Sequence, residues 1–135
     1  MTTRAERGDV EGSAPRGLDR VLVVDDDPMQ VELVQRGLSR DGFEVRGVTS
    51  IAEMALEVRR FGPRIVLIDV NMPDEPGDRA IAIARDAVPG VRIVLYSAWE
   101  ESKLRVLASQ LGADGFISKS DSVTSFGRRL RAMLP

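Results

Sequence analysis

The chain has 135 residues, of which 43% are hydrophobic and 30% are charged, and its formal net charge at pH 7 is −2. This length favours one domain, and it suffices to bury a core without disulfides or a structural metal. Cysteine and histidine are both absent, which excludes disulfides, histidine ligands and histidine general bases. Carboxylate and carbonyl oxygens remain as metal ligands, and these suit Mg²⁺, Mn²⁺ or Ca²⁺.

The charge and the hydropathy also limit the class of partner. A net negative chain does not favour nucleic-acid binding, and neither a membrane-spanning run nor a signal-peptide core is found. We therefore expect a cytoplasmic protein that binds neither nucleic acid nor membrane. Residues 1–18 are rich in Gly, Arg, Glu, Thr and Ser without an apolar period, which predicts a flexible tail before one domain at 19–135.

The N-terminal half predicts two pairs of a strand and a helix. A short run of branched apolar residues is typical of a buried strand, and apolar residues at helical spacing predict a helix. Aspartate or serine signals the start of a helix and glycine its end. In chain order we expect a strand at 21–24, a helix from the Asp27 cap to Asp41-Gly42, an edge strand at 43–46 and a helix from the Ser50 cap to Gly62.

The C-terminal half continues the same alternation. Its strands are again short and apolar, and its helices are again marked by apolar residues three or four positions apart. We expect strands at 65–68, 91–96 and 115–118, helices around 80–84 and 104–111, and a final helix capped by Asp121 or Ser122 with Val123, Phe126 and Leu130 inward.

Polar residues follow four of the five predicted strands. They are Asp25 with Asp26, then Asp69, Ser97 and Lys119. Alternating strands and helices predict a doubly wound α/β fold with a parallel sheet and right-handed crossovers. The carboxyl ends of its strands then share one edge, where open sheets of this kind bind ligands.

Asp69 follows the wholly apolar run 65–68 and precedes the loop that Asn71 and Pro73 begin. A carboxylate at the end of a buried strand is costly unless its charge is compensated. By itself it could be a turn aspartate, and the acids after the first strand could serve only the dipole of the next helix. A cap needs only one acid, however, and Asp27 supplies it.

Four segments together carry a family resemblance. They are Val-Val-Asp-Asp-Asp-Pro at 23–28, Ile-Asp-Val-Asn-Met-Pro at 68–73, Leu-Tyr-Ser-Ala at 95–98 and Gly-Ala-Asp-Gly-Phe-Ile-Ser-Lys at 112–119. In this order and spacing, the chain from Arg20 to about Leu134 resembles the receiver domain of bacterial two-component response regulators. The resemblance implies a flavodoxin-like fold with strand order 2-1-3-4-5 and helices on both faces, which puts the alternating strand 43–46 at an edge.

The resemblance also implies a chemistry centred on Asp69. This aspartate matches the phosphoacceptor, which takes a phosphoryl group from a histidine of a partner kinase or phosphotransfer protein. The implied cofactor is Mg²⁺, with Asp26 as a direct ligand, Asp25 acting through water, Asp69 giving a side-chain oxygen and Asn71 its backbone carbonyl. Ligation by oxygen atoms with retained waters is what Mg²⁺ prefers.

Three further residues match positions of the family's switch. Lys119 matches the lysine that pairs with the phosphoryl oxygens, Ser97 the hydroxyl that moves toward the phosphoryl group, and Phe116 the aromatic ring that turns inward with it. Residues 101–133 then form the implied output surface for a downstream protein. Ser120 departs from the family, which usually has proline after the lysine.

The leading interpretation is a stand-alone receiver that signals by protein–protein contact. One alternative is an interaction domain of the same fold that is never phosphorylated. Another is an aspartyl-phosphate phosphohydrolase built on Asp25-x-Asp27, which lacks the threonine expected after that pair. We therefore expect no enzymatic turnover of phosphate esters.

Overall fold

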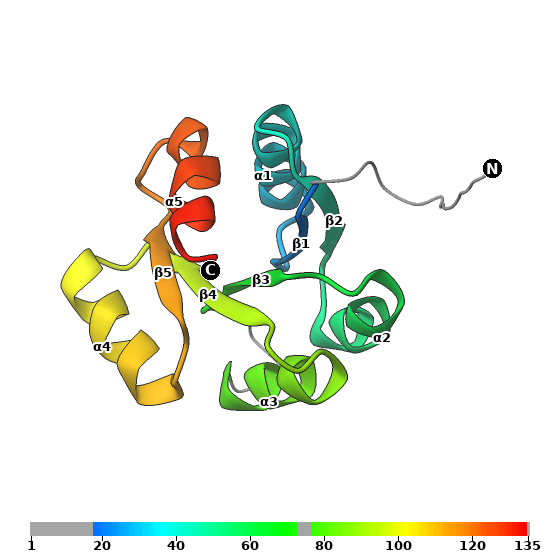
Figure 1. The fold of residues 1–135 in the computed structure, drawn as a ribbon. Helices are drawn as coiled ribbons and strands as arrows, with labels where there is room; N and C mark the ends of the chain where they lie inside the picture. Colours follow the sequence, from blue (N-terminus) through cyan, green and yellow to red (C-terminus); the bar gives the residue numbers. More distant parts are fainter. Residues whose placement is uncertain (1–17, 73–76, 135) are drawn as a thin grey trace.

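The structure, a computed structural model, describes residues 18–72 and 77–134 and contains one parallel sheet in the order β2-β1-β3-β4-β5 (Figure 1). The tail expected at 1–18 lies outside the described residues apart from Leu18. The predicted α/β class, the number of strands and their order are confirmed. The strands are β1 (Arg20–Val24), β2 (Glu44–Val48), β3 (Ile65–Asp69), β4 (Arg92–Ser97) and β5 (Gly115–Ser118).

Helices cover both faces of the sheet, as predicted (Figure 1). Buried residues of α1 and α5 share one hydrophobic cluster, and those of α2, α3 and α4 share the other. None of the helices in the described ranges is long and apolar enough to cross a membrane. The helices are α1 (Pro28–Arg40), α2 (Ile51–Phe61), α3 (Gly77–Ala87), α4 (Glu101–Leu111) and α5 (Phe126–Ala132), the last preceded by the 3-10 turn η1 (Val123–Ser125).

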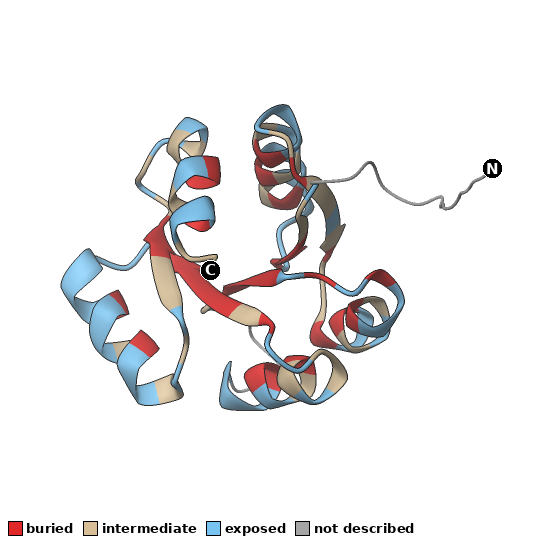
Figure 2. Ribbon diagram, in the orientation of Figure 1, coloured by how far each residue is buried: buried red, intermediate tan, exposed pale blue. Residues whose placement is uncertain are grey.

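The central strand β3 is buried along its whole length, which is why its sequence is apolar up to Asp69 (Figure 2). Successive side chains of a strand point to opposite faces of the sheet. Val66 and Ile68 accordingly pack beneath α2, α3 and α4, whereas Ile65 and Leu67 pack beneath α1 and α5. By the same alternation, Asp69 belongs to the face that α1 and α5 cover.

The helix starts follow the sequence signals closely. The Asp27 side chain accepts a hydrogen bond from the Met29 backbone N–H at 3.0 Å, and Ser50 accepts one from Glu53 at 3.1 Å. Of the two caps proposed for the last helix, Ser122 makes the capping bond, and it begins a 3-10 turn before the α-helix. That turn was not predicted, because the spacing of apolar residues does not separate the two helix types over one turn.

Several strand boundaries differ from the prediction by one or two residues. The second strand runs from 44 to 48 instead of from 43 to 46, and the fourth from 92 to 97 instead of from 91 to 96. The first strand begins one residue earlier, at Arg20, and the third ends one residue later, at Asp69. Phe43 lies just before β2 and is buried. The prediction included it in the strand because an apolar residue that enters the core looks like part of the strand in the sequence. Boundaries of this kind depend on hydrogen bonding to the neighbouring strand, here with the register Arg20 to Glu44.

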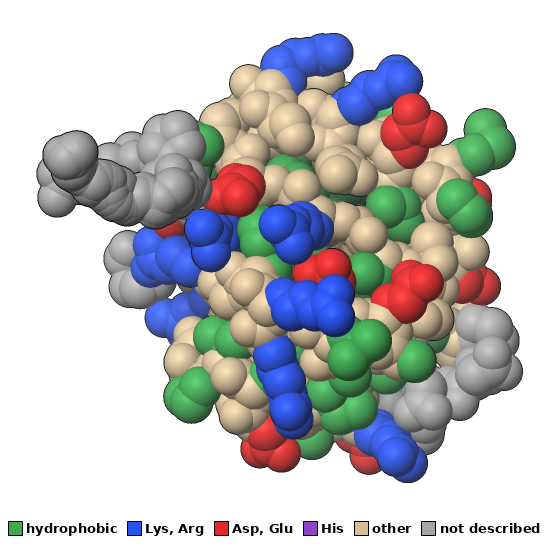
Figure 3. Space-filling view, turned by 90° about the vertical axis from the view of Figure 1, so that its right-hand side faces the viewer, with side chains coloured by type: hydrophobic (Ala, Val, Ile, Leu, Met, Phe, Trp, Pro, Cys, Tyr) green, Lys and Arg blue, Asp and Glu red, His purple; other side chains and the backbone are tan. Residues whose placement is uncertain are grey.

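The edge strand β2 is protected by charge. Its Glu44 carboxylate lies 3.0 Å from the Arg20 guanidinium, and its Arg46 guanidinium lies 3.2 Å from Glu57 of α2. Figure 3 shows basic and acidic side chains next to one another on the face at the right-hand side of Figure 1. Charged side chains on an edge strand discourage pairing with a second sheet.

Phe126 joins α5 to the sheet, since it is fully buried and its ring meets Tyr96 edge-on with centroids 6.3 Å apart. We expect Phe126→Ala to lower the free energy of unfolding by about 3–5 kcal/mol, because it leaves a cavity. Urea denaturation measures this change. Val106→Ala, at an exposed position of α4, is the control and should change stability by less than about 0.5 kcal/mol. Equal losses in the two variants would contradict this account of the packing.

Candidate functional site

Asp25, Asp69 and Lys119 meet at the carboxyl edge of the sheet, just after or at the ends of β1, β3 and β5. They come together because β3 lies beside β1 and two strands from β5, and because all three continue the series of alternate residues that faces α1 and α5. Asp25 is completely buried and Asp69 is 4% exposed. Two carboxylates at such depth need a nearby positive charge.

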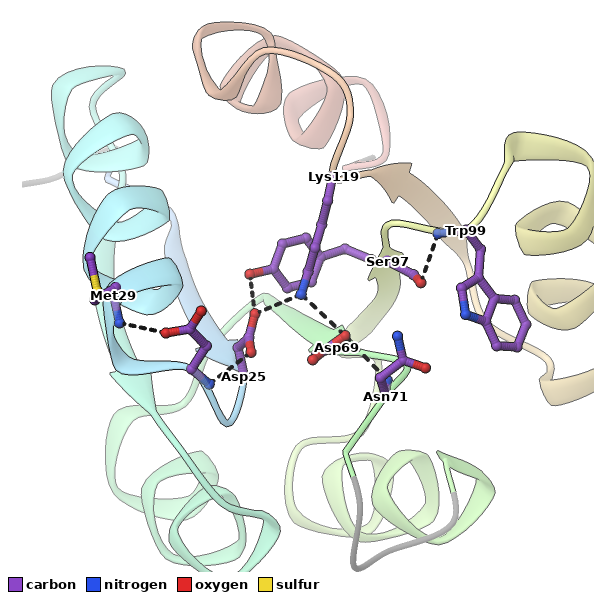
Figure 4. A network of polar contacts seen from close by, with 9 residues as sticks. Asp25, Met29, Asp69, Asn71, Ser97, Trp99 and Lys119 are labelled. Atoms are coloured by element: carbon purple, nitrogen blue, oxygen red, sulfur yellow. Dashed lines mark hydrogen bonds and ion pairs between the residues drawn. The ribbon is translucent and has the colours of Figure 1, made fainter.

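Lys119 supplies that charge (Figure 4). Its Nζ lies 3.0 Å from Oδ2 of Asp25 and 3.4 Å from Oδ1 of Asp69. The side chain extends across the strand between β5 and β3, the gap of about 10 Å that two strand spacings imply. One ammonium group thus serves two acids from two strands.

Asp25 is held on both of its carboxylate oxygens. The Tyr96 hydroxyl donates to Oδ2 at 2.6 Å, and the backbone N–H of Asp27 donates to Oδ1 at 3.0 Å. Burial by itself would raise the pKa of Asp25, but the hydrogen bonds from Tyr96 and Asp27, together with Lys119, outweigh it and lower the pKa below the usual value. Asp25 is therefore a fixed anion at the floor of the site.

Asp69 has fewer donors. The backbone N–H of Asn71 donates to its Oδ1 at 3.2 Å. Burial raises the pKa of Asp69 and the charge of Asp25 raises it further, against the opposing effects of Asn71 and Lys119. The ionised form of Asp69 is thus short of positive charge, and a bound cation would relieve that shortage.

The three acids predicted to hold a metal do converge. One carboxylate oxygen each from Asp25, Asp26 and Asp69 lie within 4.8 Å of one another. Asp26 is exposed and, within 18–72 and 77–134, makes no hydrogen bond or ion pair, so its oxygens are free to ligate. Asn71 follows Asp69 in the adjoining turn. A donor set made of oxygen atoms, part buried and part open to water, fits a hard divalent cation such as Mg²⁺.

Ser97 is also buried at this edge, but it is engaged elsewhere. Its hydroxyl accepts a hydrogen bond from the backbone N–H of Trp99 at 3.1 Å and is turned toward that residue in Figure 4. Its carbonyl accepts from the backbone N–H of Lys119 at 2.7 Å. Ser97 therefore fixes the backbone at Lys119, while its side chain lies on the side of Trp99 and α4.

Phe116 lies on the other face of the sheet from the acids. It packs against the cluster under α2, α3 and α4, and the Arg105 guanidinium of α4 lies 5.1 Å from its ring centroid. In this structure the ring is a half-buried part of the surface formed by β5 and α4. It is not part of the acidic pocket.

The loop after Lys119 is held by serines where the family usually has proline. The Ser120 backbone N–H donates to Ser118 Oγ at 3.2 Å, and the two hydroxyl oxygens lie 2.6 Å apart. No peptide bond in the described part of the chain is cis. Ser118 and Ser120 therefore set the direction of the chain that leaves the pocket.

Tyr96 is the residue of the pocket that sequence reasoning missed. It was assigned only to a strand, although its pairing with Asp69 across β3 and β4 puts it beside the acids. Its place in an apolar strand concealed it, because a tyrosine there is usually a core residue. Period-two alternation could have assigned it to the face of Asp69, but not shown which group its hydroxyl bonds.

The chain resembles known proteins over nearly all of its described length. The family model of the response regulator receiver domain matches residues 21–130. The probable transcriptional regulatory protein TcrX of Mycobacterium tuberculosis is 31% identical over 114 residues, which are 84% of this chain and 49% of that protein. The DNA-binding response regulator MtrA of Mycolicibacterium smegmatis is 32% identical over 115 residues, 85% of this chain and 50% of that protein.

Solved structures agree on the fold. The chemotaxis protein CheY4 of Vibrio cholerae superposes with a TM-score of 0.78 at 21% identity, over 87% of this chain and 100% of that one. The chain spans about half the length of the sequence relatives that it matches. The sheet order and the acidic pocket are consistent with the family match over residues 21–130. This chain therefore belongs to the response regulator receiver domain family.

Proposed function

We propose that this receiver takes a phosphoryl group onto Asp69 from a phosphohistidine of a histidine kinase or histidine phosphotransfer protein, with Mg²⁺ as cofactor. The observation that supports it best is the pocket itself. Three carboxylates from two strands and one lysine from a third converge at the ligand-binding edge of the sheet. A helix cap or a turn aspartate would need none of this convergence.

The residues of the pocket have different roles in the proposed phosphoryl transfer. Asp69 is the nucleophile, and its carboxylate oxygen forms a bond to phosphorus as the bond from phosphorus to the donor nitrogen breaks. Asp25, Asp26, Asp69 and the carbonyl of Asn71 would hold Mg²⁺, which offsets the negative charge of the acceptor and of the phosphoryl group. Lys119, already 3.4 Å from Asp69, pairs with a phosphoryl oxygen.

The phosphoryl group then acts on Ser97 and Phe116. The Ser97 hydroxyl exchanges the Trp99 backbone N–H for a phosphoryl oxygen, a change that one side-chain rotation permits. Phe116 turns inward as Ser97 moves, and the surface formed by residues 101–133 changes its affinity for a downstream protein. Differential binding of the two states is what makes such a switch work.

We propose that this domain signals by protein contact in the cytoplasm, without turnover of phosphate esters and without binding nucleic acid or membrane. The alternative of a receiver-like domain that is never phosphorylated makes the opposite prediction for labelling.

Acetyl phosphate with Mg²⁺ should add one phosphoryl mass to the wild type and none to Asp69→Asn, as measured by intact-protein mass spectrometry. Asp27→Asn is the matched control. It keeps the helix cap, because asparagine caps as well as aspartate, and should be labelled like the wild type. Loss of labelling in Asp27→Asn would favour the phosphohydrolase interpretation, and an unlabelled wild type would favour the phosphorylation-independent one.

Asp26→Asn should weaken Mg²⁺ binding at least about tenfold, which corresponds to roughly 1.4 kcal/mol. The reason is that it replaces a charged ligand by a neutral one at the open side of the pocket. Isothermal titration calorimetry measures the affinity. Asp78→Asn, at an exposed acid in the first turn of α3, is the control and should bind Mg²⁺ like the wild type. Similar affinities in all three proteins would contradict the assignment.

Lys119→Met should destabilise the metal-free protein by about 3 kcal/mol, because two buried carboxylates lose their shared countercharge. Saturating Mg²⁺ should then raise the melting temperature of this variant more than that of the wild type. Lys103→Met, at the chain's other lysine on the exposed side of α4, should change neither value. A variant that gains no more from Mg²⁺ than the wild type does would rule out a common site for lysine and metal.

A further inference from the structure

Tyr96 contacts both charged side chains that neighbour Asp69 in the pocket, Asp25 and Lys119. Its side chain is completely buried at the end of β4, directly opposite Asp69 in the pairing with β3. Its hydroxyl makes the 2.6 Å bond to Asp25 Oδ2, the same oxygen that Lys119 approaches to 3.0 Å (Figure 4). Packing alone does not require that hydroxyl, since phenylalanine would fill the same space.

The ring of Tyr96 also contacts the lysine. Nζ of Lys119 lies 4.6 Å from the ring centroid, a distance at which an ammonium is attracted to an aromatic face. Phe126 of α5 meets the ring at an interplanar angle of 87°. The ring is thus fixed by a core contact with α5, and it presents its face to the cation.

The shared oxygen has an energetic consequence. Asp25 is wholly buried, so it needs donors on both oxygens, and Asp27 and Tyr96 supply one each. These two donors share the stabilisation of the Asp25 carboxylate with Lys119. The ammonium can therefore shift toward a group on Asp69 without leaving Asp25 unbonded. Burial and the adjacent Asp25 raise the pKa of Tyr96, which keeps its hydroxyl protonated as a donor.

We propose that Tyr96 is a positioning residue of this site, with its hydroxyl fixing the Asp25 carboxylate and its ring fixing the Lys119 ammonium. The geometry stands by itself, whereas the consequence for phosphoryl transfer rests on the function proposed above. Groups that orient a ligand of a metal or of a reacting centre preorganise it and so stabilise the charged state that forms there.

Two variants separate the hydroxyl from the ring. Tyr96→Phe keeps the ring and should weaken Mg²⁺ binding about tenfold, the lower end of what loss of a ligand-orienting group causes. Tyr96→Leu removes the ring as well. Phe43→Leu is the control, because Phe43 is a buried aromatic residue of the same core cluster that pairs with Arg131 and not with the pocket. It should leave Mg²⁺ affinity unchanged.

The side-chain resonances of Lys119 report directly on its contact with the Tyr96 ring. Lys103 and Lys119 are the only lysines, so selective ¹³C labelling yields two sets of side-chain resonances, with exposed Lys103 as internal reference. The Lys119 methylene protons should be shifted upfield by the ring in the wild type and in Tyr96→Phe. They should move to the position of an exposed lysine in Tyr96→Leu.

Wild-type Mg²⁺ affinity in Tyr96→Phe together with an unchanged Lys119 spectrum in Tyr96→Leu would reduce Tyr96 to a packing residue. Neither measurement needs a phosphorylated protein. A wild type that is not labelled by acetyl phosphate, but whose Mg²⁺ affinity and Lys119 spectrum respond to the Tyr96 variants, would overturn the proposed function and leave the positioning role intact. If the wild type itself does not bind Mg²⁺, the Lys119 spectrum alone decides.

Discussion

The contact of one ammonium with two buried carboxylates is the interaction on which the rest of the site depends. Lys119 stands 3.0 Å from Asp25 and 3.4 Å from Asp69 at the end of an apolar sheet. Each carboxylate would be costly there without it, because desolvation opposes charge. The balance is still incomplete, since the exposed Asp26 adds a third negative charge close by. That surplus is what fits the pocket for a divalent cation.

The order of the strands makes this contact possible. With β3 at the centre, the acid of β1 and the lysine after β5 approach Asp69 from opposite sides. Parallel pairing sets all three strand ends at one edge, and the period of two selects the face. A shift of one residue in the pairing of β3 with β4 would move Tyr96 away from Asp69. The register is therefore as important to the site as the identity of its side chains.

Much of this could be predicted from the sequence, because the signals are local. Wholly apolar runs predicted the inner strands, and Asp27 and Ser50 predicted two helix starts. The polar residues that follow the strands predicted the acids of the pocket. The role of Tyr96 in the pocket was not predicted, because it depends on a contact between residues distant in sequence. The hydrogen bond from Tyr96 to Asp25 joins residues 71 positions apart. Nothing in either segment alone indicates that bond.

The site also extends over both faces of the sheet, and β4 connects them. Tyr96 points to the face of α1 and α5 and bonds Asp25, whereas the next residue, Ser97, bonds the backbone at Trp99 on the side of α4. Phe116 packs on that second face, below Arg105. Under the proposed function, a change of charge at Asp69 reaches α4 through Tyr96 and Ser97, two adjacent residues of one strand whose side chains lie on opposite faces of the sheet.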